Sequence, residues 1–285
     1  MNQRDRADAF RRLHQRDAGS PLVLPNAWDA MSARVIEDAG ARAIATTSAG
    51  VAWALGRRDG EGLTRDQMVN AVERITRVVR VPVTADVERG YGDGTPADVA
   101  ETVRRVIGAG AVGINLEDAP GHGGDAVLRV DEQVERIAAA REAASTEGVE
   151  LFINARVDMF LAEVGPAETR FDEAVRRARA YASAGADGIF VPGVLDAETI
   201  RALAAAISAP LNVMAGRGAS LPIAELRALG VARVSMGPAL TLAVMALIRR
   251  AAAEILRRGT YTEMADGLAF AEADPLFALR EKETW

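Results

Sequence analysis

Residues 109–118 read Ala-Gly-Ala-Val-Gly-Ile-Asn-Leu-Glu-Asp, and this stretch contains one complete helix-to-strand connection. A glycine between two alanines is typical of the left-handed residue that ends a helix, because glycine adopts positive φ without steric cost. The mostly apolar run 112–116 is typical of a strand buried on both faces. Two acidic residues follow that run. The stretch therefore predicts a helix end, a glycine cap, a buried strand and a polar strand end, in that order.

The same pattern recurs along the whole chain. Glycines in matching contexts stand at 39–41, 184–186 and 229–231. Short apolar runs typical of strands lie at 22–25, 43–47, 81–85, 112–116, 151–155, 188–191, 211–214 and 232–235. Strands that alternate with helices pair in parallel through right-handed crossovers. Eight such units predict a closed (β/α)8 TIM barrel, and an open doubly wound sheet is the alternative.

Helical periodicity fills the intervals between these strands. In 64–79 the apolar residues Met68, Val72, Ile75 and Val79 are spaced for one helix face, and Thr64 is placed to cap the helix. Similar segments lie at 96–107, 131–144, 170–184, 197–207 and 222–229.

The chain continues beyond the last strand. A long apolar-faced helix is expected at 238–258, followed by the segment 261–270 and an acidic tail. We interpret 1–285 as a single barrel domain. The extra C-terminal helices of 238–285 are expected to pack on the barrel or on a neighbouring subunit.

Composition restricts the chemistry. The 285 residues suit one barrel, and the absence of cysteine excludes disulfides, zinc–thiolate sites and thiol nucleophiles. With only two histidines, a multi-histidine metal site is excluded as well. A net charge of −6 argues against a nucleic-acid partner. We expect no membrane partner and a cytoplasmic location, because no run approaches the ~20 apolar residues of a membrane span and the N-terminus is charged.

Three carboxylates follow neighbouring strands of the expected barrel. Asp86 and Glu88 follow the third strand, and Glu117 follows the fourth. The carboxyl ends of barrel strands form one rim, so these side chains are expected to converge, and three nearby carboxylates cannot all remain ionised cheaply. Oxygen ligands select a hard cation, Mg²⁺ or Mn²⁺. Alternatively, the three are capping groups or ion pairs with Arg89 and Arg156.

Other polar residues share the expected rim. Arg156 can bind a substrate carboxylate in a bidentate fork, or form an ion pair with Asp158. The turn Ser48-Ala49-Gly50 can offer backbone N–H groups to an anion. Asn212, in the seventh strand, and Asp86 are assigned with these residues to substrate binding. His122 lies in a glycine-rich loop as a gate residue, an acid/base group or an ordinary exposed side chain.

The segment 86–92, Asp-Val-Glu-Arg-Gly-Tyr-Gly, resembles the isocitrate lyase/phosphoenolpyruvate mutase superfamily. The resemblance extends almost end to end, through 24–29, 47–50, 56–59, 116–118 and 154–158. It implies a Mg²⁺-dependent barrel that handles the enolate of pyruvate or of a related 2-oxo acid. It also implies a homotetramer, a dimer of dimers, in which neighbouring subunits exchange their terminal helices.

The resemblance also implies roles for individual residues. Ser48 and Gly50 would hold the oxo acid, and Arg156 would take its carboxylate. Asp59, together with Asp86, Glu88 and Glu117, would surround the metal and its waters. We therefore group Asp59, Glu117, Arg156 and His122 as catalytic candidates.

Departures from the superfamily pattern concern the second reactant. The Cys-containing loop of its lyases is absent, and 120–125 reads Pro-Gly-His-Gly-Gly-Asp. This loop is also shorter than the gating loop of the phosphonomutases and lacks its Asn. Pro192 stands where those mutases carry His and methylisocitrate lyases carry Glu, and Glu88 stands where Asp is commoner. The leading hypothesis is a Mg²⁺-dependent lyase or decarboxylase of a short 2-oxo or 2-hydroxy acid. The alternatives are phosphonopyruvate mutase or hydrolase chemistry, and a non-catalytic oxo-acid-binding barrel.

Overall fold

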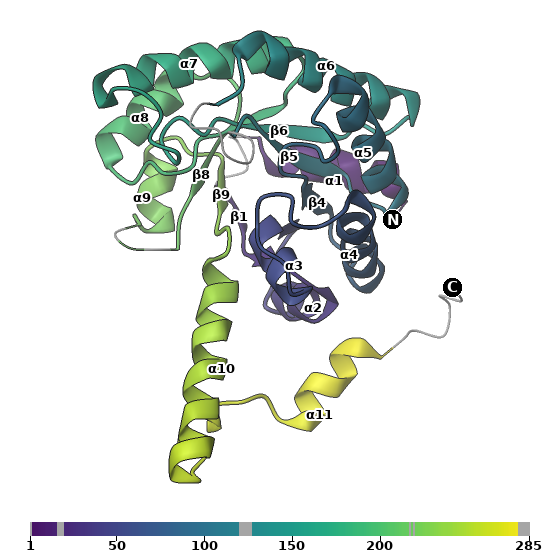
Figure 1. Cartoon of the computed structure of the whole chain (residues 1–285), viewed down its shortest axis with the longest axis vertical. Helices are drawn as coiled ribbons and strands as arrows, with labels where there is room; N and C mark the ends of the chain where they lie inside the picture. The colour runs from purple at the N-terminus through teal and green to yellow at the C-terminus, as the bar shows by residue number, and fades with distance from the viewer. Residues whose placement is uncertain (1, 16–19, 120–126, 217, 219, 279–285) are drawn as a thin grey trace.

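The chain forms a barrel of parallel strands wrapped by helices (Figure 1). The computed structural model describes residues 2–15, 20–119, 127–216, 218 and 220–278. All pairings in its nine-stranded sheet are parallel, in the order β1-β9-β8-β7-β6-β5-β4-β3-β2. The predicted (β/α)8 TIM-barrel class is confirmed.

The first strand of the barrel closes it, because this strand pairs with a different strand on each side. It is divided at Pro25 into β1 (Leu22–Leu24), which pairs with β9 (Arg233–Ser235), and β2 (Asn26–Ala27), which pairs with β3 (Ile44–Thr46). Proline has no N–H to donate to a ladder, so the strand changes partner at this point. Because β2 lies beyond the predicted run 22–25, nine strands appear where eight were predicted.

The register of the central strands sets the rim. These strands are β4 (Val83–Asp86), β5 (Gly113–Glu117), β6 (Phe152–Arg156), β7 (Gly188–Phe190) and β8 (Leu211–Met214). Asp86 lies opposite Asn115, and Glu117 lies opposite Arg156. The strand ends predicted to carry the chemistry therefore meet on one side of the barrel.

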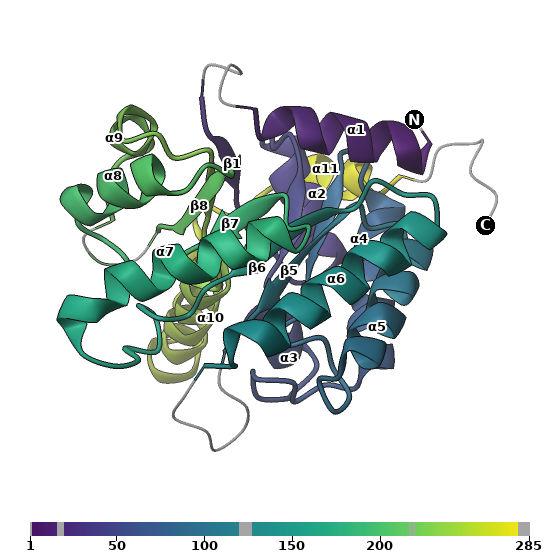
Figure 2. The same cartoon turned by 90° about the horizontal axis from the view of Figure 1, so that it is seen from above.

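Six helices form where periodicity predicted them, and they are α4 (Arg65–Val78), α5 (Pro96–Gly108), α6 (Val130–Thr146), α7 (Ala167–Ser183), α8 (Ala197–Ala206) and α9 (Ile223–Ala228). Three further helices were not predicted, and they are α1 (Gln3–Leu13), α2 (Ala30–Asp38) and α3 (Ser48–Ala54). Thr64 caps α4 with a reciprocal bond to Gln67, as predicted. The four predicted cap glycines all have φ between 89° and 111°. In Figure 2, α5, α6 and α7 lie side by side on the outer face.

Alternation along the strands separates two environments. Side chains such as Ile114, Leu116 and Ile153 belong to the apolar core. Their sequence neighbours point the opposite way, into the barrel, and two of these are buried asparagines: Asn154 Nδ2 donates to Asn115 Oδ1 at 2.8 Å. The barrel interior below the rim is therefore polar.

Helix α1 packs against the amino ends of the central strands. His14 stacks on Phe152, with the ring centroids 3.9 Å apart, and Phe10 contacts both rings edge-on. Burial, reinforced by the charge of Arg233, lowers the pKa of His14 to about 3. This histidine is therefore neutral and belongs to the packing of the core.

The C-terminal segment leaves the barrel. Helix α10 (Ala239–Arg258) projects away from it, and the short elements η2 (Thr262–Met264), α11 (Phe270–Ala273) and η3 (Asp274–Phe277) follow (Figure 1). The predicted helix at 238–258 is confirmed. Arg34 on α2 donates to the carbonyl of Leu276 at 2.9 Å, so the chain returns to its own α2 after α10. No helix in the described ranges is long and apolar enough to cross a membrane.

Candidate active site

Asp86 stands at the end of β4 with one satisfied and one unsatisfied carboxylate oxygen. Its Oδ2 accepts from the N–H of Ser48 at 3.1 Å, and its own N–H donates to Thr46 Oγ1 at 2.8 Å. Its Oδ1 is buried without a hydrogen-bond partner. Burial raises the pKa of Asp86, and the positive charge of Arg156 opposes that shift. The unpartnered oxygen is a donor atom available to a cation.

Glu88 is buried two residues further on, and both of its carboxylate oxygens are engaged. Oε2 accepts from the N–H of Glu61, and Oε1 accepts from the hydroxyl of Tyr91 at 3.0 Å. Burial, followed by the charge of Asp86, raises the pKa of Glu88 to about 7. The backbone N–H of Glu117 donates to the carbonyl of Glu88 at 3.0 Å, which links the ends of β4 and β5.

Arg156 is held by two carboxylates. Its Nη1 forms an ion pair with Glu117, while Nε and Nη2 bind the two oxygens of Asp158 at 2.6 and 2.8 Å. Burial raises the pKa of Glu117 well above its ordinary value, although Arg156 opposes the shift. The ion pair between Arg156 and Asp158 that the sequence left open is therefore formed, and the bidentate fork is directed at the protein's own carboxylate.

A second row of residues fixes Asp158. Its N–H donates to Asp118 Oδ1 at 2.9 Å. The other oxygen of Asp118 accepts from Tyr181 Oη at 2.6 Å and from Arg177 Nη1 at 2.9 Å. Asp118 is fully buried, so this network orients Asp158 and, through it, the guanidinium of Arg156.

The turn of residues 48–50 forms the start of α3. The N–H of Ser48 is used by Asp86, so it is not free for a substrate. Ala49 is buried behind it. A Cβ added at Gly50 would lie 2.7 Å from Thr47 Cγ2 and 2.8 Å from Trp28 Cβ, so close packing requires glycine here. In this structure these residues build the wall of the site and support Asp86.

The remaining candidates are spread over different depths. Asn212 is buried inside the barrel, where its Nδ2 donates to Ser235 Oγ at 3.1 Å and its Oδ1 is without a partner. Asp59 is exposed in the turn between α3 and α4. His122 lies outside the described residues.

The fit of a divalent cation can be judged from these donors. No three Asp, Glu or His side chains among the described residues stand together as a ready-made metal site. The predicted direct ligation by Asp86, Glu88 and Glu117 together is therefore not shown. Burial nevertheless raises the pKa of all three. The oxygen-only donor set suits a hard cation such as Mg²⁺, and Asp86 Oδ1 is the available donor atom.

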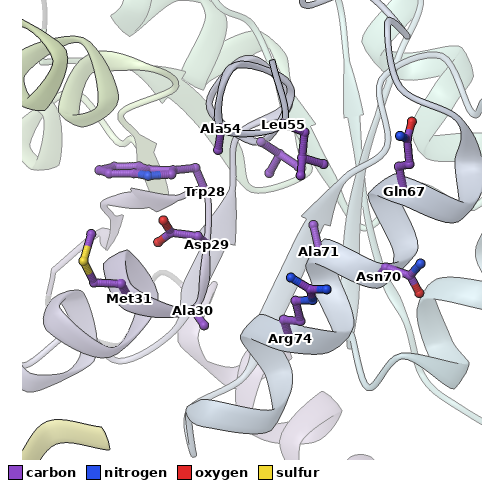
Figure 3. Close-up of a pocket in the computed structure, with 11 residues that line it drawn as sticks. Trp28, Asp29, Ala30, Met31, Ala54, Leu55, Gln67, Asn70, Ala71 and Arg74 are labelled. Atoms are coloured by element: carbon purple, nitrogen blue, oxygen red, sulfur yellow. The ribbon is translucent and has the colours of Figure 1, made fainter. Parts of the chain in front are cut away.

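One cavity of the molecule lies away from these charges. A cavity of about 450 Å³ opens between α2, α3 and α4 (Figure 3). Trp28, Met31 and Leu55 supply its apolar lining, and Arg74 and Asn70 reach it from α4. None of the predicted site residues lines it, so the carboxylate site at the strand ends is a separate place.

Sequence reasoning assigned no role to Glu61, Asp118 or Arg233. Glu61 contacts the site through its backbone, and its position two residues after Asp59 gave no signal. Arg233 did give one, because an arginine inside the apolar run 232–235 indicates a charge within the barrel. It is fully buried and donates to Asn115 Oδ1 at 3.2 Å.

Together these features define a barrel with an acidic, arginine-containing site at the carboxyl ends of its strands, where barrel enzymes carry their active sites. The family model described as phosphoenolpyruvate phosphomutase matches residues 10–256. The chain belongs to this family, within the phosphoenolpyruvate mutase/isocitrate lyase superfamily, as the sequence motifs indicated. Members of the superfamily include lyases, decarboxylases and mutases.

Three relatives illustrate the range. The chain is 35% identical to an oxaloacetate decarboxylase of Ectopseudomonas mendocina over 193 residues, which is 66% of this chain and 63% of that protein. It is 49% identical, with a TM-score of 0.81, to a Burkholderia cenocepacia structure provisionally named a phosphonomutase, covering 86% of this chain and 98% of that one. An oxaloacetate acetylhydrolase in complex with 3,3-difluorooxalacetate is 27% identical, with a TM-score of 0.84 and coverages of 95% and 92%.

The raised pKa of Glu88 predicts a pH dependence of stability. A carboxyl whose pKa rises from 4.5 to about 7 on folding stabilises the metal-free protein below about pH 4.5, and this contribution is lost as pH rises through about 7. The contribution amounts to roughly 3 kcal/mol. His14 acts in the opposite direction between about pH 3 and 6.5. The measurement is therefore the difference in unfolding free energy between wild type and Glu88→Gln at pH 5 and pH 8. An identical difference at both pH values would contradict the assignment.

Proposed function

We propose that this chain is a divalent-metal-dependent enzyme that cleaves or decarboxylates a short 2-oxo or 2-hydroxy carboxylic acid through an enolate of pyruvate type. The observation that carries the proposal is the unpartnered, buried oxygen of Asp86 at the rim that also holds Arg156. A bound Mg²⁺ or Mn²⁺ would stabilise negative charge on the substrate oxygens. The names of two relatives, oxaloacetate decarboxylase and oxaloacetate acetylhydrolase, support a 2-oxo dicarboxylate as the substrate class.

Each residue has a separate task in this proposal. Asp86 would hold the cation through Oδ1, and Glu88, Glu117 and Asp59 would act on it through water. Arg156 binds the substrate carboxylate through Nη1, the nitrogen that now contacts Glu117, and Asp158 keeps the guanidinium in place. Once displaced from its cationic partner, Glu117 takes up a proton, because burial already raises its pKa. The exchange replaces one carboxylate by another and keeps the net charge of the site nearly constant.

The absence of cysteine restricts how the enolate can be protonated. With no cysteine, the proton that quenches the enolate must come from an oxygen acid, His122 or solvent. This favours reactions with a simple leaving group, such as carbon dioxide, over cleavage that needs a thiol acid.

Carbon–phosphorus chemistry is the second candidate. The 49% identical Burkholderia structure and the description of the matching family favour it. Phosphorus NMR of phosphonopyruvate incubated with the protein and Mg²⁺ distinguishes the two, because only this second function changes the phosphorus spectrum.

Turnover should depend on Asp86. We expect oxaloacetate decay, or aldol-type cleavage of a C4 to C7 acid, to require Mg²⁺ and to fall at least about 100-fold in Asp86→Ala, since a direct ligand is lost. Asp38→Ala, at the exposed end of α2, serves as the control. Equal rates in wild type and Asp86→Ala, or rates unaffected by EDTA, would remove the proposal. Oxalate binding without turnover of any acid would leave a binding protein in its place.

Arg156 should govern affinity for the acid. Replacing it by alanine is expected to weaken oxalate binding by ~2–4 kcal/mol, because a buried carboxylate loses its charged partner. Arg156→Lys keeps the charge without the fork and should recover only part of the loss. Calorimetry with oxalate measures both variants, and an unchanged dissociation constant for Arg156→Ala would contradict the role.

We also propose that α10 packs against second copies of the chain in a homotetramer, a dimer of dimers. Its outward side chains support this, since Leu240, Met245, Leu247, Ile248 and Leu256 are all exposed. Sedimentation should give four subunits for wild type and fewer for Ile248→Glu combined with Leu256→Glu. A monomeric wild type would refute the assembly.

A further inference from the structure

Glu61, Glu88 and Tyr91 form a closed ring of hydrogen bonds at the edge of the site. The N–H of Glu61 donates to Glu88 Oε2, and the hydroxyl of Tyr91 donates to Glu88 Oε1 at 3.0 Å. The ring closes where the N–H of Tyr91 donates to Glu61 Oε1 at 2.7 Å. Each residue therefore contacts both of the others, although Glu61 is 27 positions away from Glu88 along the chain.

The same three residues share a rare backbone conformation. Their φ angles are 57° at Glu61, 50° at Glu88 and 60° at Tyr91. Side chains other than glycine adopt this left-handed region at an energetic cost, so it persists only where surrounding interactions impose it. The only other described non-glycine residue with positive φ is Glu163, at 51°, in an exposed turn before α7. Three of the four strained positions thus lie in one hydrogen-bonded ring.

Hydrogen bonds rather than packing hold Glu61 in this conformation. It is only half-buried, and it lines a cavity of about 350 Å³ together with Leu63, Thr64, Arg65, Tyr91 and Gly92. The turn itself is tight, because a Cβ at Gly62 would lie 2.1 Å from the carbonyl oxygen of Arg58. The carboxylate of Glu61 and its N–H therefore form two hydrogen bonds that join the turn carrying Asp59 to the residues that follow β4.

We propose that Glu61 is a positioning residue that fixes the carboxylate of Glu88 and the turn bearing Asp59 at the cation end of the site. The proposal rests on the proposed function, because it concerns the same divalent cation. Glu61 itself touches neither cation nor substrate. Its carboxylate receives the Tyr91 N–H, its backbone N–H holds Glu88, and the left-handed backbone at all three positions lets these groups face one another.

This role predicts a separation between stability and cation binding. Glycine at position 61 would adopt the left-handed backbone without strain but would remove the acceptor for Tyr91. Glu61→Gly should therefore keep or raise Tm while it weakens cation binding. A purely structural residue would show the opposite pattern, with affinity falling only as stability falls.

The test measures the Kd of Mn²⁺ alone by electron paramagnetic resonance, beside the Tm of each metal-free variant. Loss of a residue that orients a metal-binding group raises Kd by about 10–100-fold, and we expect that rise in Glu61→Gly and Glu61→Ala. Glu61→Gln retains an acceptor oxygen and should stay within about threefold of wild type. Glu163→Gly is the matched control, in which strain is removed outside the site, and its Mn²⁺ affinity should equal that of wild type.

The outcomes separate cleanly. A rise in Kd in Glu61→Gly with Tm preserved, together with recovery in Glu61→Gln, supports the role. Wild-type affinity in Glu61→Gly and Glu61→Ala overturns it while leaving the proposed function intact. A rise confined to variants with lowered Tm, or equal in Glu163→Gly, also overturns it. If wild type binds no Mn²⁺, the proposed function fails, and the positioning role fails with it.

Discussion

Burial of several carboxylates at one rim of a closed barrel is the constraint on which the rest of the site depends. Asp86, Glu88 and Glu117 are removed from water by the same architecture that aligns the strand ends, and burial raises the pKa of each. Their charge must be balanced by protons, by Arg156 or by a cation. In the structure, the charge of Glu117 is balanced by an ion pair with Arg156, whereas one oxygen of Asp86 has no hydrogen-bond partner.

Two groups of residues hold these charged side chains in place. Behind Arg156, the buried carboxylate of Asp118 receives Tyr181, Arg177 and the Asp158 backbone, and so fixes the positive partner. Beside Asp86, the ring of Glu61, Glu88 and Tyr91 holds the carboxylate of Glu88 in place. Backbone strain is concentrated in the second group, as expected where geometry serves the site rather than the stability of the fold.

Sequence patterns predicted the barrel because its rules are local. Glycine caps, buried strand runs and helical spacing each need only a few neighbouring residues, and they located every strand except β2, as well as the Thr64 cap of α4. The division of the first strand at Pro25 could not be predicted this way, since it depends on which strands lie on each side. The placement of Asp86, Glu88, Glu117 and Arg156 at one rim followed from the rule that strand ends share one rim, whereas the ion pairs of Arg156 were only alternatives and the partners of Asp86 and Glu88 were not predicted.

Those partners depend on distances of a few ångström between side chains, which the spacing of residues in the sequence does not predict. Whether Arg156 faces a substrate or Asp158 is decided by the position of Asp118, forty residues away from Asp158 in the chain. The ring around Glu88 depends on a turn between α3 and α4 that carries no periodic signal. Gly50 was assigned to anion binding on its sequence context, and that assignment stays a prediction; the structure adds that close packing against Thr47 and Trp28 requires glycine here.

The most direct test of the central claim is a crystal of the protein soaked with Mn²⁺ and oxalate, in which the anomalous signal of manganese is located. The charge-balance account predicts a single strong peak at bonding distance from Asp86 Oδ1, with oxalate against the guanidinium of Arg156. A site without manganese, or a peak distant from Asp86, would show that the buried carboxylates are balanced in another way.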